Sequence, residues 1–250
     1  MADWKDNRTT RQGFGTSPGF TGASVPRTGE VFDAGLRRHM LSIYNYMSSG
    51  VLLTGIVAML TANSGLAYAF AGGPLMWLVM LSPLAIVLAM SFGANKFSRP
   101  TLQAMYWGFA FLMGLSLSTI FLVYTGASIA VTFFATSAAF AGLSLWGYTT
   151  KKDLSGWGSF LIMGVVGLIV ASVINMFVQS PAFMYAVSFI GVLIFAGLTA
   201  YDTQRLKAQY LQLRGTEFAG KAIILGALSL YLDFINMFLF LLRFMGATRE

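Results

Sequence analysis

The chain contains no cysteine, and only 10% of its 250 residues carry a charged side chain. Without cysteine it has no disulfide, thiolate metal ligand, iron–sulfur cluster or cysteine nucleophile. The scarcity of charge is equally informative, because soluble domains are about 25% charged and about 45–50% apolar. Here 56% of the residues are apolar, so a soluble fold would lack the polar surface that water requires. The composition therefore excludes a water-soluble globular protein.

Three long stretches of the chain carry no charged residue at all. They cover residues 40–95, 100–150 and 154–201, and contain 56, 51 and 48 residues. A helix needs about 20 apolar residues to cross the hydrocarbon core of a membrane, so each stretch accommodates two crossings. Turn residues such as Asn63-Ser64-Gly65 and Gln179-Ser180-Pro181 mark the breaks between them. These stretches predict six transmembrane helices, over residues 41–62, 75–93, 102–123, 127–148, 157–178 and 182–201, and the apolar residues 222–244 predict a seventh. We therefore expect an all-α membrane protein with seven transmembrane helices.

The ends of the chain differ in composition from this region. Residues 1–38 are rich in glycine, threonine, serine and arginine and show no periodic apolar pattern. We predict that they form a disordered cytoplasmic tail. The seven-helix transmembrane domain then covers residues 39–246, with a polar linker over residues 203–221 before the last span. Residues 247–250 form a short C-terminal tail.

Basic residues indicate which side of the membrane each connection faces. Charged connections alternate with three connections that carry no charge, and the charged ones hold Arg37 and Arg38, Lys96 and Arg99, Lys151 and Lys152, and Arg205, Lys207, Arg214 and Lys221. The positive-inside rule places the N-terminus and these connections in the cytoplasm, which explains the net charge of +7 without nucleic-acid binding. Seven crossings put the C-terminus outside, whereas Arg243 and Arg249 favour the inside, so the last segment either crosses fully or is re-entrant.

Asp233 is the one charged residue at mid-depth in an apolar span, about 16 Å along the last one. An aspartate at the centre of a membrane costs roughly 2.5–3.5 kcal/mol on insertion scales, so it should not face lipid. On a helical wheel it shares a stripe of about 100° with small and polar residues that include Ser229 and Asn236. We expect the other helices to enclose this one, with Ser229 and Asn236 lining a polar interior. The alternative is a purely structural aspartate that a neighbouring helix satisfies.

Asp202 ends the sixth span, and Arg205 three residues later is its natural partner on the same helix face. If the sixth and seventh spans are antiparallel neighbours, Asp202 and Asp233 lie on facing helices. Two carboxylates about 4 Å apart repel by on the order of 4 kcal/mol at an effective dielectric of 20, so the pair would share one proton. Calcium takes about six to eight oxygen ligands. The doubly ionised pair would therefore offer calcium a weak site, suited to passage.

Three segments carry a family resemblance: KKDLSGWGSFLIMGVVGLIVASVINMF at 151–177, LIFAGLTAYDTQRLK at 193–207 and LSLYLDFINMFLFLLRFMG at 228–246. Together they resemble the bacterial branch of the Bax-inhibitor (transmembrane Bax-inhibitor-motif) family, and the resemblance extends over about residues 35–246. It implies seven helices with the last one wrapped by the other six. It further implies a proton-sensitive calcium leak in the inner membrane and, in eukaryotic relatives, protection against cell death.

The resemblance also implies roles for individual residues. Asp202 and Asp233 match the paired gating aspartates of the family. The basic latch partner of the family lies at the cytoplasmic end of the second helix, where this chain has Lys96, with Arg99 nearby. The expected partners are therefore the lipid bilayer, calcium ions and protons, and no cofactor is expected.

Of two other classes of function, the residues around Asp233 disfavour one, an enzyme, and the other, a non-channel regulator, stays open. An intramembrane aspartyl protease also uses two acids on neighbouring helices, but the presenilin-type motif has a Gly-x-Gly-Asp turn. Here Leu230, Tyr231 and Leu232 precede Asp233, and such bulky residues leave no room for a substrate backbone, so we predict no enzyme activity. The remaining alternative is a non-channel regulator that binds and modulates a membrane protease or a stress response, with the N-terminal tail as its docking element.

Overall fold

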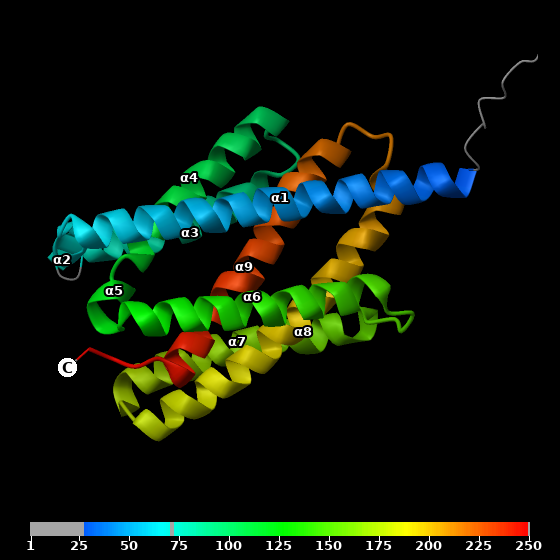
Figure 1. The fold of residues 1–250 in the computed structure, drawn as a ribbon. Helices are drawn as coiled ribbons and strands as arrows, with labels where there is room; N and C mark the ends of the chain where they lie inside the picture. The colour runs from blue at the N-terminus through cyan, green and yellow to red at the C-terminus, as the bar shows by residue number, and fades with distance from the viewer. Residues whose placement is uncertain (1–27, 71–72, 250) are drawn as a thin grey trace, which may run out of the picture.

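The computed structural model describes residues 28–70 and 73–249, and these residues form nine helices and no named β-strand. Seven spans in them are long and apolar enough to cross a membrane, with α4 and α5 together forming one. This confirms the predicted all-α membrane fold. In chain order the helices are α1 (Thr28–Asn63), α2 (Leu66–Phe70), α3 (Gly73–Gly93), α4 (Arg99–Leu117), α5 (Ile120–Val123), α6 (Gly126–Thr149), α7 (Ser155–Val178), α8 (Pro181–Leu213) and α9 (Ala219–Met245) (Figure 1).

The predicted turn residues end and begin the helices. α1 ends at Asn63, and Gly65 follows with φ +79°, a left-handed conformation that glycine adopts without a steric penalty. Between α7 and α8, Gln179 takes the left-handed conformation and the Ser180 side chain accepts a hydrogen bond from the Phe183 backbone amide. Such N-caps satisfy amides that have no partner within the helix. Local chemistry therefore determines where these helices stop.

Two helices extend beyond the predicted spans. α8 continues to Leu213, so most of the linker that we predicted over residues 203–221 is helical, and that part of the prediction is wrong. Residues 203–213 are rich in strong helix formers and contain no glycine or proline before Gly215. α1 already includes residues 28–38, and the rest of the predicted N-terminal tail lies outside the described residues.

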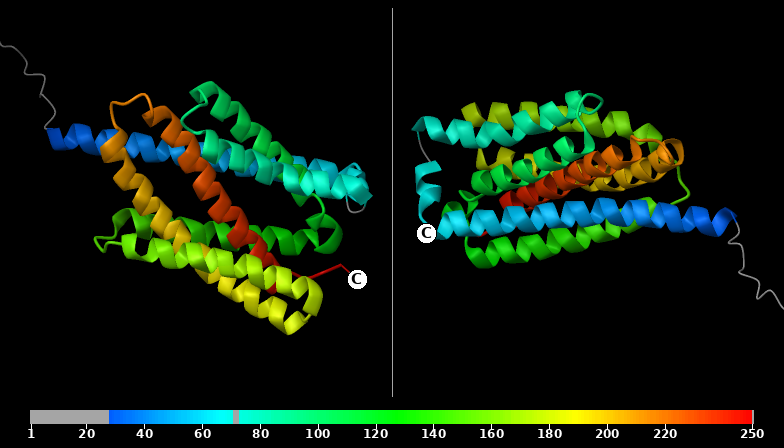
Figure 2. Two further views of the ribbon diagram at one scale, coloured as in Figure 1. Left: turned by 180° about the vertical axis from the view of Figure 1, so that it is seen from behind. Right: turned by 90° about the horizontal axis from the view of Figure 1, so that it is seen from above.

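α9 is the central helix of the bundle, as predicted. In its most apolar window 67% of the residues are buried, compared with 11–39% in the other six spans. α9 packs mainly against α1, α4, α6 and α8, whereas α3 packs on α4 and α7 packs on α8 (Figure 2). Tyr231 and Asp233 in the middle of α9 therefore face protein, and lipid contacts the outer helices.

The C-terminal residues lie at the opposite end of the bundle from the start of α9. At the start, the Lys221 ammonium donates to the Ala94 carbonyl in the basic connection between α3 and α4. Beyond the end of α9, residues 247–249 pair with residues 123–125 in an antiparallel bridge, which we term the C-terminal clasp. α9 thus crosses the whole bundle, and the re-entrant alternative is wrong. Under the positive-inside rule, the clasp lies on the extracytoplasmic side.

Candidate functional site

α8 and α9 approach each other closely in the cytoplasmic half of the bundle. A Cβ atom added at Gly226 of α9 would lie 2.7 Å from the Cδ2 atom of Leu206 on α8, closer than real Cβ contacts. Because glycine has no side chain, the Leu206 side chain packs directly on the backbone of α9 here. Polar side chains of the two helices meet next to this contact.

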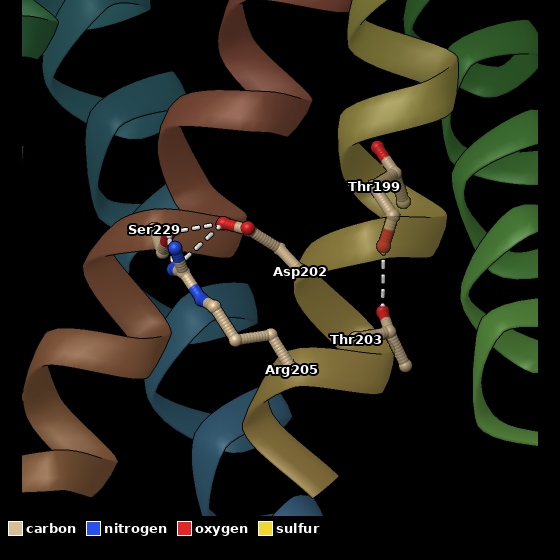
Figure 3. Close-up of polar contacts among 5 residues, drawn as sticks. All are labelled: Thr199, Asp202, Thr203, Arg205 and Ser229. Carbon is tan, nitrogen blue, oxygen red and sulfur yellow. Dashed lines mark hydrogen bonds and ion pairs between the residues drawn. The ribbon is translucent and has the colours of Figure 1, made fainter. Parts of the chain in front are cut away.

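The structure brings Asp202, Arg205, Ser229 and Asp233 together at this interface, and we term them the aspartate cluster. Asp202 is only 5% exposed, and its Oδ2 atom lies 3.2 Å from Nη2 of Arg205. Ser229 of α9 donates its hydroxyl hydrogen to the same Oδ2 atom and accepts a 3.1 Å hydrogen bond from Arg205 (Figure 3). One serine therefore joins the charged pair of α8 to α9.

Asp233 lies one turn further along α9 from Ser229 and is also 5% exposed. Its Oδ2 atom is buried without a hydrogen-bond partner among the described residues. The charged groups close enough to act on it electrostatically are Asp202 and Arg205. Asp202 bonds to Ser229 and Arg205 rather than to Asp233, so a serine occupies the place where we predicted the second carboxyl group. With both acids ionised, the cluster holds two negative charges and one positive charge.

A crevice leads to the cluster from the connection between α8 and α9. Its volume is about 280 Å³, and it lies between α3, α8 and α9. Leu213 and Phe218 line it at the cytoplasmic end, while Arg205 and Ser229 line it inside. The polar cluster is therefore adjacent to a space that begins at the cytoplasmic surface.

The side of α8 that faces away from α9 fixes the orientation of Asp202. Thr203 donates to the Thr199 carbonyl at 2.8 Å (Figure 3). Its hydroxyl oxygen lies 3.5 Å from that of Ser144 on α6 and 3.4 Å from that of Tyr44 on α1. Lys207 of the same helix donates to the Tyr148 carbonyl of α6 at 2.9 Å. These contacts hold the helix rotation that directs Asp202 at α9.

The predicted latch residues on the second span lie outside the cluster. Lys96 and Arg99 are exposed, and the Arg99 side chain lies against Gly220 at the start of α9. Within residues 28–70 and 73–249, the ion pair of the cluster is formed by Arg205. Of the three basic residues that we predicted as partners, the structure therefore brings Arg205 to Asp202, while a latch role for the other two stays a prediction.

Of the predicted lining residues, Ser229 lines the crevice, whereas Asn236 donates to the Leu232 carbonyl of its own helix at 2.8 Å. The part of the chain that the structure describes contains no group of three or more histidine, cysteine or acidic side chains that would hold a metal ion. The weak calcium site on Asp202 and Asp233 therefore stays a prediction.

One polar contact at the centre of the bundle was not predicted. The Tyr231 hydroxyl lies 2.7 Å from the Thr54 hydroxyl, which also donates to the Ala110 carbonyl at 2.8 Å. These bonds tie α9 to α1 and α4 two residues before Asp233. The sequence did contain a signal for this contact, namely a tyrosine in the middle of an apolar span, because a buried phenol usually requires a hydrogen-bond partner.

Comparison with known proteins matches the chain to one family and to several bacterial relatives. Residues 36–250 match the family described as "Inhibitor of apoptosis-promoting Bax1". An uncharacterized protein of Caulobacter vibrioides is 48% identical over 229 residues, which cover 87% of this chain and 92% of that protein. The inner membrane protein YbhL of Escherichia coli is 45% identical over 220 residues, covering 86% of this chain and 94% of the relative. An uncharacterized protein of Borreliella burgdorferi is 39% identical over 216 residues, covering 85% and 93%.

Proposed function

This chain belongs to the Bax inhibitor family of membrane proteins, and from this premise we propose that it is a cation leak channel gated by protonation of Asp202 and Asp233. It is an integral protein of the bacterial inner membrane, with seven spans in the part that the structure describes. Calcium is the ion that we propose to pass. The observation that carries the proposal is the buried aspartate cluster at the inner end of the crevice.

The charge balance of the cluster supports a proton-dependent gate. One guanidinium neutralises one carboxylate, so ionising both Asp202 and Asp233 leaves an excess negative charge in a buried place. Burying an unpaired charge is costly, and like charges at short range repel. Taking up one proton removes that excess. The two protonation states therefore favour different separations of α8 and α9.

The position of the cluster supports a role in cation passage. Acidic residues inside a membrane domain that face the bundle interior mark ion pathways or proton relays by default. Asp202 and Asp233 face protein, and the crevice beside them begins at the cytoplasmic connection. A cation that enters this crevice meets Arg205 and the Ser229 hydroxyl, and the Asp202 carboxylate to which both are bonded lies directly behind them. Carboxylate and hydroxyl oxygens are the ligands that calcium prefers.

Calcium flux into liposomes tests this proposal. The full-length protein is reconstituted with a calcium dye inside the vesicles, and flux is measured between about pH 5 and 8, the range in which protonation of the pair is expected to change. We expect pH-dependent flux from the wild-type protein and pH-independent flux from Asp202→Asn and Asp233→Asn. Asp153→Asn is the matched control, because Asp153 is an exposed acid in the connection between α6 and α7, and it should behave as the wild type.

Two results would contradict the proposal. The same pH profile in all four proteins would reject Asp202 and Asp233 as the proton sensor. An absence of flux from correctly folded wild-type protein would reject the channel and favour the non-channel regulator of a membrane protease or stress response.

A further inference from the structure

A second and larger cavity opens between α1 and α6, away from the crevice. Its volume is about 740 Å³, within the range of about 300–1,000 Å³ that is usual for ligand pockets. Phe234 of α9 contributes to its lining, and the remaining lining residues come from α1 and α6, two of the membrane-spanning segments. We term this cavity the lateral groove.

The groove runs along the helices rather than across them. On α1 its lining extends from Arg37 to Leu52, and on α6 from Phe133 to Tyr148. Each stripe covers fifteen residue steps, which correspond to about 22 Å of helix. The hydrocarbon core is about 30 Å thick, so the groove extends from the cytoplasmic boundary through the depth of the inner leaflet. An extended acyl chain has this shape.

The two ends of the groove differ in polarity. At the cytoplasmic end lie the exposed Arg37 and the half-buried Tyr148. The Lys207 ammonium lies 5.0 Å from the centroid of the Tyr148 ring. At the other end the lining is apolar, with Leu52 of α1 and Phe133 of α6. The groove therefore combines a positively charged mouth at headgroup level with an apolar interior.

The polar side chains inside the groove are already engaged with protein. Ser137 donates to the Phe133 carbonyl at 2.8 Å. The Tyr44 hydroxyl lies 3.4 Å from the Thr203 hydroxyl, and the Ser144 hydroxyl lies 3.5 Å from the same oxygen. Water has few partners left there, and apolar cavities of this kind stay dry or take up apolar ligands. Hydrocarbon is therefore the suitable occupant.

We propose that the lateral groove binds one anionic phospholipid, with an acyl chain between α1 and α6 and its phosphate at Arg37. A guanidinium forms strong bidentate hydrogen bonds to phosphate, and basic pockets between transmembrane helices on the cytoplasmic side recognise anionic headgroups. The acyl chain lies over Phe140 and Phe234 in the floor of the groove.

The groove is linked to both acids of the aspartate cluster through the residues that follow them in the sequence. Phe234 in its floor follows Asp233, and Tyr44 in its wall contacts Thr203, which follows Asp202. A bound lipid therefore biases how α9 and α8 are held, and its binding alters the pH profile of the leak. This regulatory consequence rests on the proposed function, whereas the lipid site itself does not.

Native mass spectrometry tests the lipid site. Full-length protein is reconstituted in nanodiscs of phosphatidylcholine and phosphatidylglycerol, and the lipids retained on each released chain are identified. We expect the wild-type chain to retain one phosphatidylglycerol. Ala141→Trp, which fills the groove, should abolish retention, and Ala139→Trp is the matched control because Ala139 is exposed on α6 away from the groove. Arg37→Gln should lower the preference for phosphatidylglycerol by about fivefold.

The outcomes separate the proposal from its alternatives. Equal retention by Ala141→Trp and Ala139→Trp, or no retained lipid on the wild-type chain, would overturn it. Equal retention of the two lipids by the wild-type chain would overturn the assignment of the phosphate to Arg37. Thermal unfolding of each variant checks its fold, and Arg37→Gln at the exposed mouth keeps the proposal testable if Ala141→Trp is unfolded. A protein that retains lipid but shows no flux would refute only the channel.

Discussion

The two halves of α9 present different chemistry to the surrounding helices. The cytoplasmic half carries Ser229 and Asp233, borders the crevice, and meets the charged pair on α8. The extracytoplasmic half carries Phe234, Phe238 and Phe240, which meet the rings of other phenylalanines on α6 and α8. Polar groups are thus concentrated in one half, and aromatic packing in the other.

The aromatic half is tightly packed. The ring centroids of Phe140 and Phe234 lie 5.5 Å apart in an edge-on arrangement, and those of Phe195 and Phe240 are stacked at 5.8 Å. Such pairs stabilise a core beyond the area that they bury. The comparison assigns the two halves different parts in the proposed function: the charged cluster exchanges protons through the crevice, and the aromatic layer is the dry barrier towards the other side of the membrane.

The largest expected effect comes from weakening that barrier. Phe238 is buried, and its ring centroid lies 6.3 Å from that of Phe133. Phe238→Ala should lower the free energy of unfolding by about 3 kcal/mol, because it leaves a cavity in the core. It should also raise calcium flux at every pH without changing the pH profile.

Unfolding in mixed micelles and flux into liposomes measure these two effects. Phe244→Ala is the control, because Phe244 is 43% exposed on the outer part of the same helix and should change both quantities little. If Phe238→Ala altered the pH profile instead of the overall flux, the separation between a sensing half and a barrier half would be disproved.

A smaller effect is expected in the polar half. Ser229→Ala removes the hydrogen bonds that join α9 to the carboxylate and guanidinium of α8. We expect a loss of about 1.5 kcal/mol in stability, because hydrogen bonds to charged groups contribute at least that much. The midpoint of the flux against pH should move to higher pH, since a hydroxyl donor favours an ionised carboxylate.

Urea or SDS titration and the flux assay check this variant against Ser229→Thr, which keeps the hydroxyl group. The threonine variant should retain a midpoint near that of the wild type. An identical midpoint in the alanine variant would show that Ser229 only packs between the helices.

The smallest effect is expected at the C-terminal clasp. Deleting residues 247–250 removes the backbone bonds from Thr125 to Ala247, at 3.0 Å, and from Arg249 to Val123, at 2.8 Å. We expect a loss of about 1 kcal/mol, because exchange with water offsets most of each bond, and an unchanged pH profile. Calorimetry of the deletion, compared with Arg249→Gln, which keeps the backbone bonds, measures this loss. An altered pH profile would connect the clasp to the sensor.

Much of the fold could be predicted because its determinants are local. Charge-free runs of suitable length gave six of the seven spans, the apolar residues around Asp233 gave the seventh, and Ser180 with Pro181 marked the start of α8 as the structure has it. The extension of α8 to Leu213 could not be inferred from hydropathy, because glutamine, arginine and lysine interrupt its leucines. Leu206, 2% exposed, secures this extension through packing against α9, and tertiary packing of this kind leaves little trace in local composition.

The members of the candidate site were easier to predict than their contacts. An aspartate in an apolar span identified Asp233, and a spacing of three residues identified Arg205 as the partner of Asp202. The serine between the two acids depends on the rotation of α8 and on the close approach at Gly226. Neither quantity can be obtained from residue order alone.

The charged pair of Asp202 and Arg205 lies within one turn of α8, and that helix runs unbroken from Pro181 to Leu213. A pair inside a rigid helix travels with it and cannot fasten one helix to another. When α9 slides or tilts against α8, the contacts that part are those of a neutral hydroxyl. Asp202 and Arg205 thus stay paired during such a movement, and neither of these two ions is left alone in a medium of low dielectric constant.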